Sequence, residues 1–219
     1  NKQIKYMRDA QTLREGLLQE PGNIRYQFYL ALSCLWAGSI TEAIMEFKKR
    51  VVMGGWEEEV YFSKLQIARV LVLLSDTPTS MVGNQAIIQA HLDAWEYRPH
   101  RFEALYAILK AHRLADQLQK SYEYGVQAIQ HCFVSCGDKL FVNDPIQRYK
   151  FLDELAVAAY WSNDHALAIR ANDAIINTYR AGDDIDMTRV NKNRAFSVQQ
   201  LQTLEAQKLN QQLLQPKHK

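Results

Sequence analysis

The stretch from Tyr26 to Glu59 contains two apolar-striped segments separated by the Gly38-Ser39 break. In each segment, apolar residues recur at three- and four-residue spacing, which predicts one buried face on each of two helices. These residues are Leu30, Cys34 and Ala37 before the break, and Ala43, Ile44, Phe47 and Val51 after it. Because a lone pair of helices cannot bury both of its faces, the pattern predicts that further pairs stack on this one.

The same pattern recurs along the chain. When the pairs are aligned on their turns, one position in the first helix of each pair falls at spacings of 37, 41 and 47 residues; it is occupied by Ala31, Ala68, Leu109 and Ala156. The turns between the helices of the pairs fall at Gly38, Ser75, Ala115 and Asn163. The sequence therefore predicts an all-α protein, a solenoid of about four antiparallel helix pairs with terminal helices, wound into a right-handed superhelix.

Composition agrees with that fold class. The chain has 219 residues, of which 47% are hydrophobic and 23% charged, enough to bury a core. It contains only five prolines and nine glycines, and almost no alternating pattern of the kind that strands show. The net charge of +2 is too small to favour bulk binding of nucleic acid or a membrane surface.

Helices are expected over residues 3–19, within the pair at 26–59, and from 56 to 74. They are also expected over 85–97, 101–114, 121–132, 147–161, 166–179 and 196–214. Residues 75–84 and 133–145 are expected to be connectors. We expect residues 1–186 to form the repeat domain and residues 187–219 to form a basic, glutamine-rich and partly helical extension. Its thin apolar stripe makes a helix marginal there unless it docks on the body.

The helix pairs resemble tetratricopeptide repeats, whose unit is about 34 residues long. The matching residues are Leu30-Ala31, Gly38, Ala43 and Phe47 in the first copy and Pro99 at the close of the second. The observed spacings are longer than that unit, so a simple regular superhelix is not expected.

A narrower resemblance rests on five strings: FYLALSCLWAG, KKRVVMGGWEEEVY, QIAR, AWEYRPHRFEALY and LFVNDPIQRYKFLDELAVAAY. They resemble the helical segment that follows the catalytic domain in certain family 2 (GT-A type) glycosyltransferases, over roughly residues 5–196. The resemblance implies that this chain is the carboxy-terminal helical part of a sugar-transfer enzyme. The strand-helix alternation and strand-end Asp-x-Asp of the catalytic part are not found here.

The alignment of first helices predicts a concave binding groove. Its positions combine cations with aromatic rings: Arg25, Phe28, Trp36, Arg69, Tyr106, Lys110, Arg113, Lys150, Tyr160 and Trp161. A basic, aromatic face suits an acidic or extended peptide segment. The alternative is scattered surface charge on an irregular array. Similarly, Trp36 and Trp161 are candidates for stacking on sugar rings, although packing between helices is the commoner role of tryptophan.

A second cluster of cations surrounds Pro99. Arg98, His100 and Arg101 could grip a phosphate or carboxylate as an anion corner. The competing interpretation is a helix-to-helix corner whose cations lie near the negative end of the preceding helix.

Two motifs suggest metals only superficially. Asp184-Ile185-Asp186 has the spacing of a metal-binding Asp-x-Asp, but it follows a helix and a glycine, which favours a solvated turn. His131, Cys132 and Cys136 offer three ligands where structural zinc requires four. We therefore expect no metal, no cofactor and no catalytic residue in this chain, with Cys132 packed at a helix end.

These observations favour a non-catalytic, tetratricopeptide-like scaffold that binds proteins. It would belong to a glycosyltransferase, act alone as an adaptor for acidic or extended peptides, or assist directly in binding a sugar acceptor. Whether the polypeptide is an enzyme stays open. Expected partners are a protein or peptide, including a catalytic domain of the same polypeptide, and an oligomer is possible; nucleic acid and a membrane span are not expected. Three cysteines without a disulfide framework predict a cytoplasmic location, and the initial Asn predicts a fragment or processed product.

Overall fold

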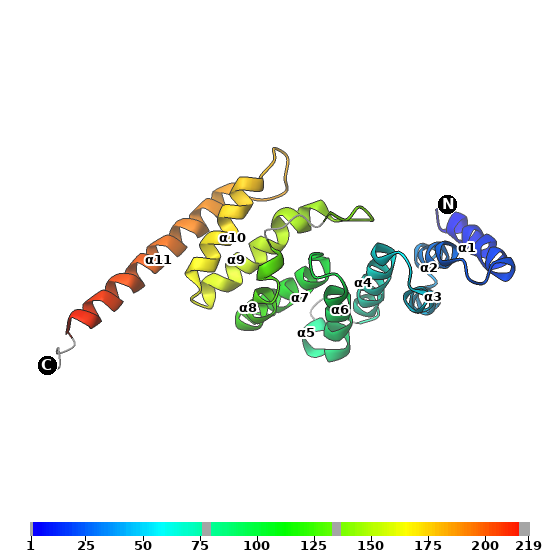
Figure 1. The fold of residues 1–219 in the computed structure, drawn as a ribbon, viewed down its shortest axis with the longest axis horizontal. Helices are drawn as coiled ribbons and strands as arrows, with labels where there is room; N and C mark the ends of the chain where they lie inside the picture. Colours follow the sequence, from blue (N-terminus) through cyan, green and yellow to red (C-terminus); the bar gives the residue numbers. More distant parts are fainter. Residues whose placement is uncertain (1, 76–79, 133–136, 215–219) are drawn as a thin grey trace.

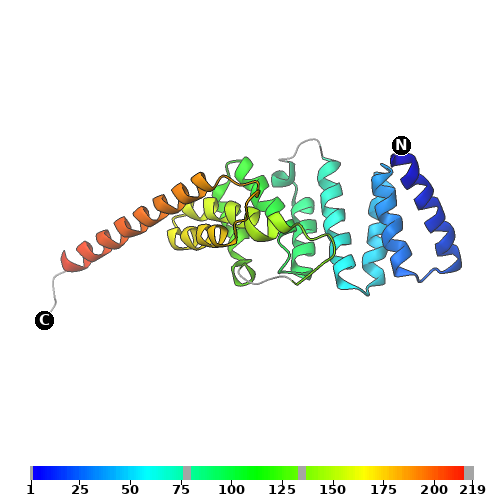
Figure 2. The ribbon, with the colours of Figure 1, turned by 90° about the horizontal axis from the view of Figure 1, so that it is seen from above.

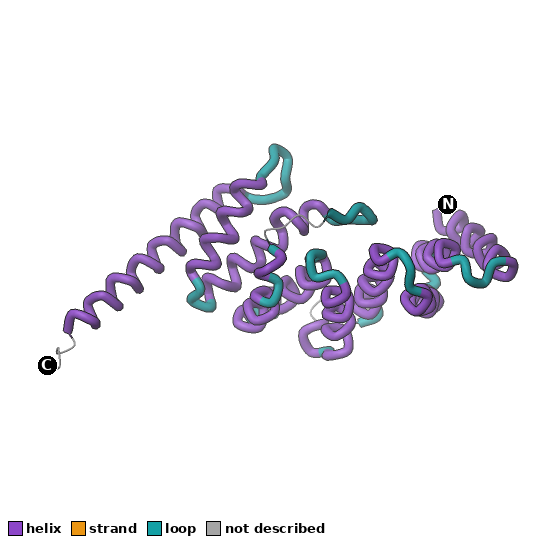
Figure 3. Tube along the Cα trace, in the orientation of Figure 1, coloured by secondary structure: helices purple, strands orange, loops and turns teal. Residues whose placement is uncertain are grey.

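The computed structural model describes residues 2–75, 80–132 and 137–214, and every regular element in those ranges is helical (Figure 3). The helices of the first half are α1 (Lys2–Gln19), α2 (Ile24–Trp36), α3 (Ile40–Met53), α4 (Glu57–Leu73), α5 (Ser80–Gly83) and α6 (Gln85–Tyr97). Those of the second half are α7 (Glu103–Leu114), α8 (Leu118–Val126), η1 (Ile129–His131), η2 (Ile146–Lys150), α9 (Phe151–Trp161), α10 (His165–Thr178) and α11 (Met187–Leu214).

The helix pairs follow one another along an elongated body, with the two termini at opposite ends (Figures 1 and 2). Helix α2 packs on α3, α4 on α6, α7 on α8, and α9 on α10, and each pair contacts the next. The structure thus confirms the predicted all-α solenoid of stacked helix pairs.

Side-chain caps and left-handed residues set the ends of the helices. The Asn23 carboxamide accepts from the backbone N–H groups of α2, Asn84 does the same for α6, and the Asp164 carboxylate does so for α10. The α2–α3 turn places Gly38 at φ 85°, a conformation that glycine adopts at little cost. Asn163 takes the corresponding left-handed conformation, at φ 62°, in the last pair.

The apolar residues form two clusters. One lies at the N-terminal end, centred on Phe28 and Phe47, and the larger one extends from α4 to α11. Ala31 and Ala68, the small residues at the aligned position, are both wholly buried, as a close approach of two helices requires. The alignment of the first two pairs is therefore confirmed at this position.

The third pair differs from the sequence expectation. Helix α8 ends at Val126, not at Cys132, and a short 3₁₀ turn at Ile129–His131 follows it. Gly125 lies in the last turn of α8, where an added Cβ would come within 2.7 Å of the Leu155 side chain. The close approach of α8 to α9 at this position therefore depends on glycine. Helix α7 also begins two residues later than expected, because Arg101 is held in a side-chain network described below.

Helix α11 begins at Met187, nine residues before the expected start at 196. Its first half packs along α10, where Val190 and Ser197 are almost completely buried. Docking supplies the contacts that a thin apolar stripe lacks on its own, which is why composition alone placed the start too late. The second half extends past the body (Figure 1). The division into domains at residue 186 stays a prediction.

Candidate binding groove

The predicted groove residues are distributed over several clefts. A cleft between α1 and α2 is lined by Arg25 and Trp36. The next, between α4 and α7, is lined by Arg69, Tyr106 and Lys110, and a third, between α7 and α9, by Tyr106, Lys110, Arg113 and Lys150. A fourth, among α9, α10 and α11, is lined by Tyr160 and Trp161. The two central clefts share residues of α7. Tyr106 and Lys110 belong to both, so these two clefts form one surface across α4, α7 and α9, which we call the central groove.

One residue of the predicted groove is buried, and a second is held in an ion pair. Phe28 is wholly buried and packs edge-on against Phe62, so it cannot contact a ligand. Arg25 is exposed but donates to Glu59 at 3.3 Å, and Glu59 also holds the buried Arg50 at 2.9 Å. The alignment of the helix pairs placed Phe28 on the open face. In the structure, α2 is covered on that side by Phe141, which lies in the connector before η2 and stacks on Phe28.

The part of the central groove between α4 and α7 has a volume of about 510 Å³. Apolar side chains form most of its wall, and they include Val72, Leu73, Met81, Ala111, Leu114 and Ile146. Its polar members are Gln66, Arg69, His91 and Glu103 from the inner side and Lys110 at the rim. This cleft is therefore an apolar pocket that contains a few polar groups, the usual composition of a binding site.

Arg69 is the most unusual group in this cleft. Its side chain is half-buried, and it makes neither a hydrogen bond nor an ion pair with any described residue. Burial lowers the pKa of Arg69, opposed by the nearby Tyr61 and Glu103. Burial also lowers the pKa of His91, whose Nδ1 lies 2.9 Å from the Ile87 carbonyl oxygen and whose charge the Arg69 cation further disfavours.

The part of the central groove between α7 and α9 is different in charge. It has a volume of about 500 Å³, and acidic residues from α9 and from the turn before α11 face its cations. Arg113 is paired with Glu154, Arg189 with Asp153 at 2.8 Å, and Lys150 with Asp184 at 3.5 Å. The sequence identified the cations but not these carboxylates. In this half of the groove, carboxylates therefore balance the cations of the predicted basic, aromatic face.

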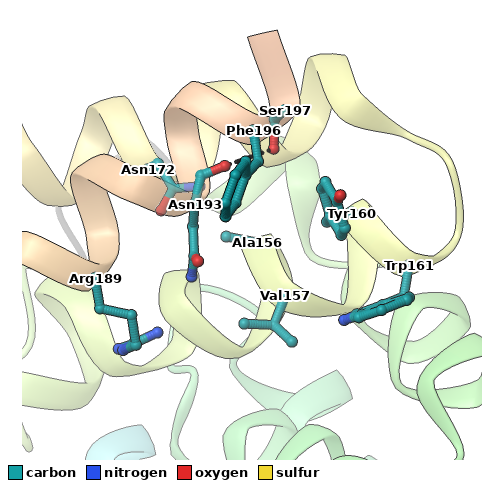
Figure 4. Close-up of a pocket in the computed structure, with 9 residues that line it drawn as sticks. All are labelled: Ala156, Val157, Tyr160, Trp161, Asn172, Arg189, Asn193, Phe196 and Ser197. Carbon is teal, nitrogen blue, oxygen red and sulfur yellow. Dashed lines mark hydrogen bonds between the residues drawn. The ribbon is translucent and has the colours of Figure 1, made fainter. Parts of the chain in front are cut away.

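The cleft at the C-terminal end has an aromatic rim (Figure 4). Trp161 is 65% exposed and Phe196 is 45% exposed, with Tyr160 next to Trp161 in an edge-on contact. The volume is about 370 Å³, and Ala156 and Val157 form part of its wall. This cleft adjoins the central groove at Arg189, which lines both. Trp36, in contrast, contacts Tyr6 in a tilted arrangement with ring centroids 4.9 Å apart.

The predicted anion corner is occupied by the protein's own carboxylates. Arg98 donates to Asp138 at 2.5 Å and to Glu57 at 2.6 Å. Arg101 is wholly buried; it donates to Glu103 at 2.7 Å and to Asp138 at 3.3 Å, and it lies over the ring of Tyr61. These bonds tie the connector before α9 to the α6–α7 corner, so Arg98 and Arg101 are structural cations and not a ligand site.

His100 belongs to the same network. Its Nε2 lies 3.4 Å from an Asp138 oxygen, and its carbonyl accepts from Gln147 at 2.9 Å. Gln147 in turn accepts from the Phe102 backbone N–H at 2.8 Å, which fixes the start of α7 against η2. The sequence placed three cations at a helix corner correctly, but their carboxylate partner is about forty residues away and could not be assigned from spacing.

The metal candidates show no assembled site. Within the described ranges, no three or more His, Cys, Asp or Glu side chains come together as a possible metal site. Cys132 is buried and its thiol donates to the Ala128 carbonyl, so it packs at a helix end as predicted, while Cys136 lies outside the described residues. Asp184 is 95% exposed and paired with Lys150 in a turn. No helix among the described residues is long and apolar enough to cross a bilayer.

Sequence reasoning missed several residues of the central groove. Gln66 and Leu73 flank Arg69 at three- and four-residue spacing on α4, and Ala107 and Leu114 flank Lys110 in the same way on α7. Such spacing places side chains on one face of a helix, so extending the register by a turn in each direction would have identified them.

Comparisons with known proteins give little further guidance. No protein-family model matches the chain, and no curated protein matches it. A solved structure titled "MamA RS-1 ArsTM double mutant" is similar over 84% of this chain and 98% of its own, with 15% sequence identity and a TM-score of 0.46. At that score we draw no functional argument from it. None of these findings links the chain to glycosyltransferases.

Proposed function

We propose that this chain is a non-catalytic helical-repeat module that binds an extended segment of a partner protein in the central groove. The observation that carries the proposal is the continuity of the two central clefts through Tyr106 and Lys110 on α7. A groove that crosses the first helices of successive pairs can accommodate a segment of extended chain, while the helices behind it supply a rigid support.

The charge pattern refines the expected partner. The cleft between α4 and α7 presents Arg69 and Lys110, whereas the cleft between α7 and α9 pairs its cations with carboxylates. A wholly acidic segment is therefore a poor match for the full length of the groove. A segment with a short acidic part for the α4–α7 cleft and a mixed or polar part beyond it is a better one.

The test uses a bulky substitution that fills the groove. Ala107 is partly exposed on the wall of the α4–α7 cleft, so Ala107→Trp should occlude the site with little effect on the core. Ala86→Trp, at an exposed position on α6, is the matched control. Peptides selected on the wild-type chain from a random display library should lose binding to Ala107→Trp and retain it with Ala86→Trp. Failure to select any peptide, or peptides that bind both variants equally, would contradict the proposal.

We also propose, on the sequence resemblance alone, that the module is part of a glycosyltransferase polypeptide whose catalytic domain is one candidate occupant of the groove. A direct role in binding the sugar acceptor would use the aromatic rim at Tyr160, Trp161 and Phe196, which is open to solvent. The full-length protein purified from its source provides the test. Transfer activity that depends on a nucleotide sugar is expected, and an unrelated domain or an absence of transfer would exclude this assignment while leaving the groove proposal intact.

A further inference from the structure

Arg69 has a charge that the described chain does not neutralise. Side chains of this type are rarely buried without a partner, because desolvation of an unpaired cation is costly. Gln66, one turn earlier on α4, is 7% exposed and likewise has no hydrogen-bond partner for its carboxamide among the described residues. Both side chains line the α4–α7 cleft. Two adjacent polar groups with unused hydrogen-bonding capacity therefore face a mostly apolar pocket.

The carboxylate whose charge acts on Arg69 does not neutralise it. Glu103 lines the same cleft, but its oxygens accept from Arg101 at 2.7 Å, from the Tyr61 hydroxyl at 3.0 Å and from the Asn143 backbone N–H at 3.1 Å. Its charge is thus shared with a buried arginine that also contacts Asp138. His91, on the other side, is buried and its neutral form is favoured. The cleft therefore has an excess of positive charge next to Arg69.

The rest of the cleft specifies what should accompany a negative charge. Lys110, exposed at the rim, lies over the Tyr106 ring at 5.7 Å and makes no ion pair with a described residue. Leu73 and Leu114 are 69% and 55% exposed on the two facing helices. Large exposed apolar side chains that flank a pocket are typical of a contact surface. They provide contact area for an aliphatic or aromatic side chain beside the charge.

From this geometry we infer that the α4–α7 cleft is a subsite for an Asp or Glu side chain of the bound segment, paired with Arg69 and followed by an apolar side chain that packs on Leu73 and Leu114. This inference rests on the proposed function of the central groove. A side-chain carboxylate is assigned, not a chain terminus, because the groove continues past Lys110 into the α7–α9 cleft and leaves room for the segment to extend.

The inference is tested with the peptides selected on the wild-type chain. They should share an Asp or Glu next to an apolar residue, and Arg69→Gln should weaken their binding by about tenfold to a hundredfold, as expected for loss of a charge-assisted hydrogen bond in a partly desolvated site. Arg8→Gln, which removes an exposed cation on α1, is the matched control and should leave the affinity unchanged. Replacing the acidic peptide residue by Gln should weaken binding to the wild type but have little further effect on Arg69→Gln.

Each outcome separates the two proposals. Peptides that are blocked by Ala107→Trp but are indifferent to Arg69→Gln would overturn the carboxylate subsite and leave the groove in place. Peptides that are indifferent to both substitutions would overturn both. Loss of binding on amidation of the peptide C-terminus, with no effect of replacing the internal acidic residue, would show that a terminal carboxylate occupies the site and would contradict the side-chain assignment.

Discussion

Arg101 and Arg69 occur in neighbouring helix pairs and lie within electrostatic range of the same carboxylate, Glu103, yet their environments are opposite. Arg101 is wholly buried and its guanidinium is satisfied by Glu103, Asp138 and backbone carbonyls of the connector. Arg69 is half-buried, opens onto a cleft and has no ionic partner in the described chain. Arg101 forms its ion pairs within the chain, whereas Arg69 presents a positive charge that a bound ligand can neutralise.

The comparison shows why a cation in a sequence does not by itself indicate a ligand site. Arg98, His100 and Arg101 form the more compact cluster in the sequence, but the connector brings Asp138 to them. Arg69 stands alone in the sequence among apolar residues, and no carboxylate of the described residues forms an ion pair with it. The site is distinguished by the absence of a partner in that part of the chain, which only the three-dimensional arrangement reveals.

The largest change in stability is expected from breaking the ion-pair cluster of Arg101, Glu103 and Asp138. Arg101→Met should destabilise the chain by about 3–5 kcal/mol, because it leaves the buried Glu103 without its counter-ion and removes one of the two arginines that hold Asp138. Urea denaturation followed by circular dichroism measures the change. Arg69→Met is the matched control for loss of side-chain length and charge. Equal effects of the two substitutions would mean that the contrast between these arginines is wrong.

The second largest effect is expected from acid, which should weaken the ion pairs at the α6–α7 corner. Burial alone would raise the pKa of Glu103 and of Asp138, but hydrogen bonds and charge from Arg101 and Arg98 outweigh it and hold both pKa values below their ordinary range. Because the folded pKa lies below the unfolded one, the stabilisation is complete above the unfolded pKa and is lost as the pH falls through the folded value. The free energy of unfolding should therefore decrease below about pH 4.5.

Asp138→Asn supplies the control for that titration. It should reduce stability at neutral pH and flatten the acid dependence, because one of the two titrating groups is removed. A wild-type protein whose stability is constant from neutral pH to pH 3, or a variant with the same acid dependence as the wild type, would contradict the assigned network.

The smallest effect is expected at Arg69. Arg69→Met removes a charge that has no partner among the residues that the structure describes, and it keeps the apolar contacts of the stem. The free energy of unfolding should stay the same or rise by up to about 1 kcal/mol. Urea denaturation under the same conditions as for Arg101→Met provides the measurement. A loss of more than about 2 kcal/mol would show that Arg69 has a structural partner and is not available to a ligand.

Much of the fold was predictable because it depends on local signals. The Gly38-Ser39 break, the buried Ala31 and Ala68 and the caps near Asn163 all follow from periodicity and backbone preference. The close packing of Leu155 on Gly125 was not predictable, since it depends on an approach between α8 and α9. The start of α11 depends in the same way on its docking against α10.

The candidate site was predictable only in part. The register placed Arg69, Tyr106 and Lys110 on one surface, as the structure has them. It could not show that Arg113 is neutralised by Glu154 or that Phe28 is covered, because both depend on side chains from other elements. Spacing within a helix identifies the face on which a residue lies, and charge compensation between helices decides whether that face is free.

The central claim is that Arg69 makes no ion pair with the described residues and becomes paired when a segment binds, and NMR of the arginine Nε–Hε groups tests it most directly. In the free chain, the Arg101 Hε, which is donated to Glu103, should exchange slowly with water, and the Arg69 Hε should exchange rapidly. Adding a selected acidic peptide should shift and protect the Arg69 signal and leave the Arg101 signal unchanged. An Arg69 signal that is already protected without peptide, or that does not respond to saturating peptide, would contradict the claim.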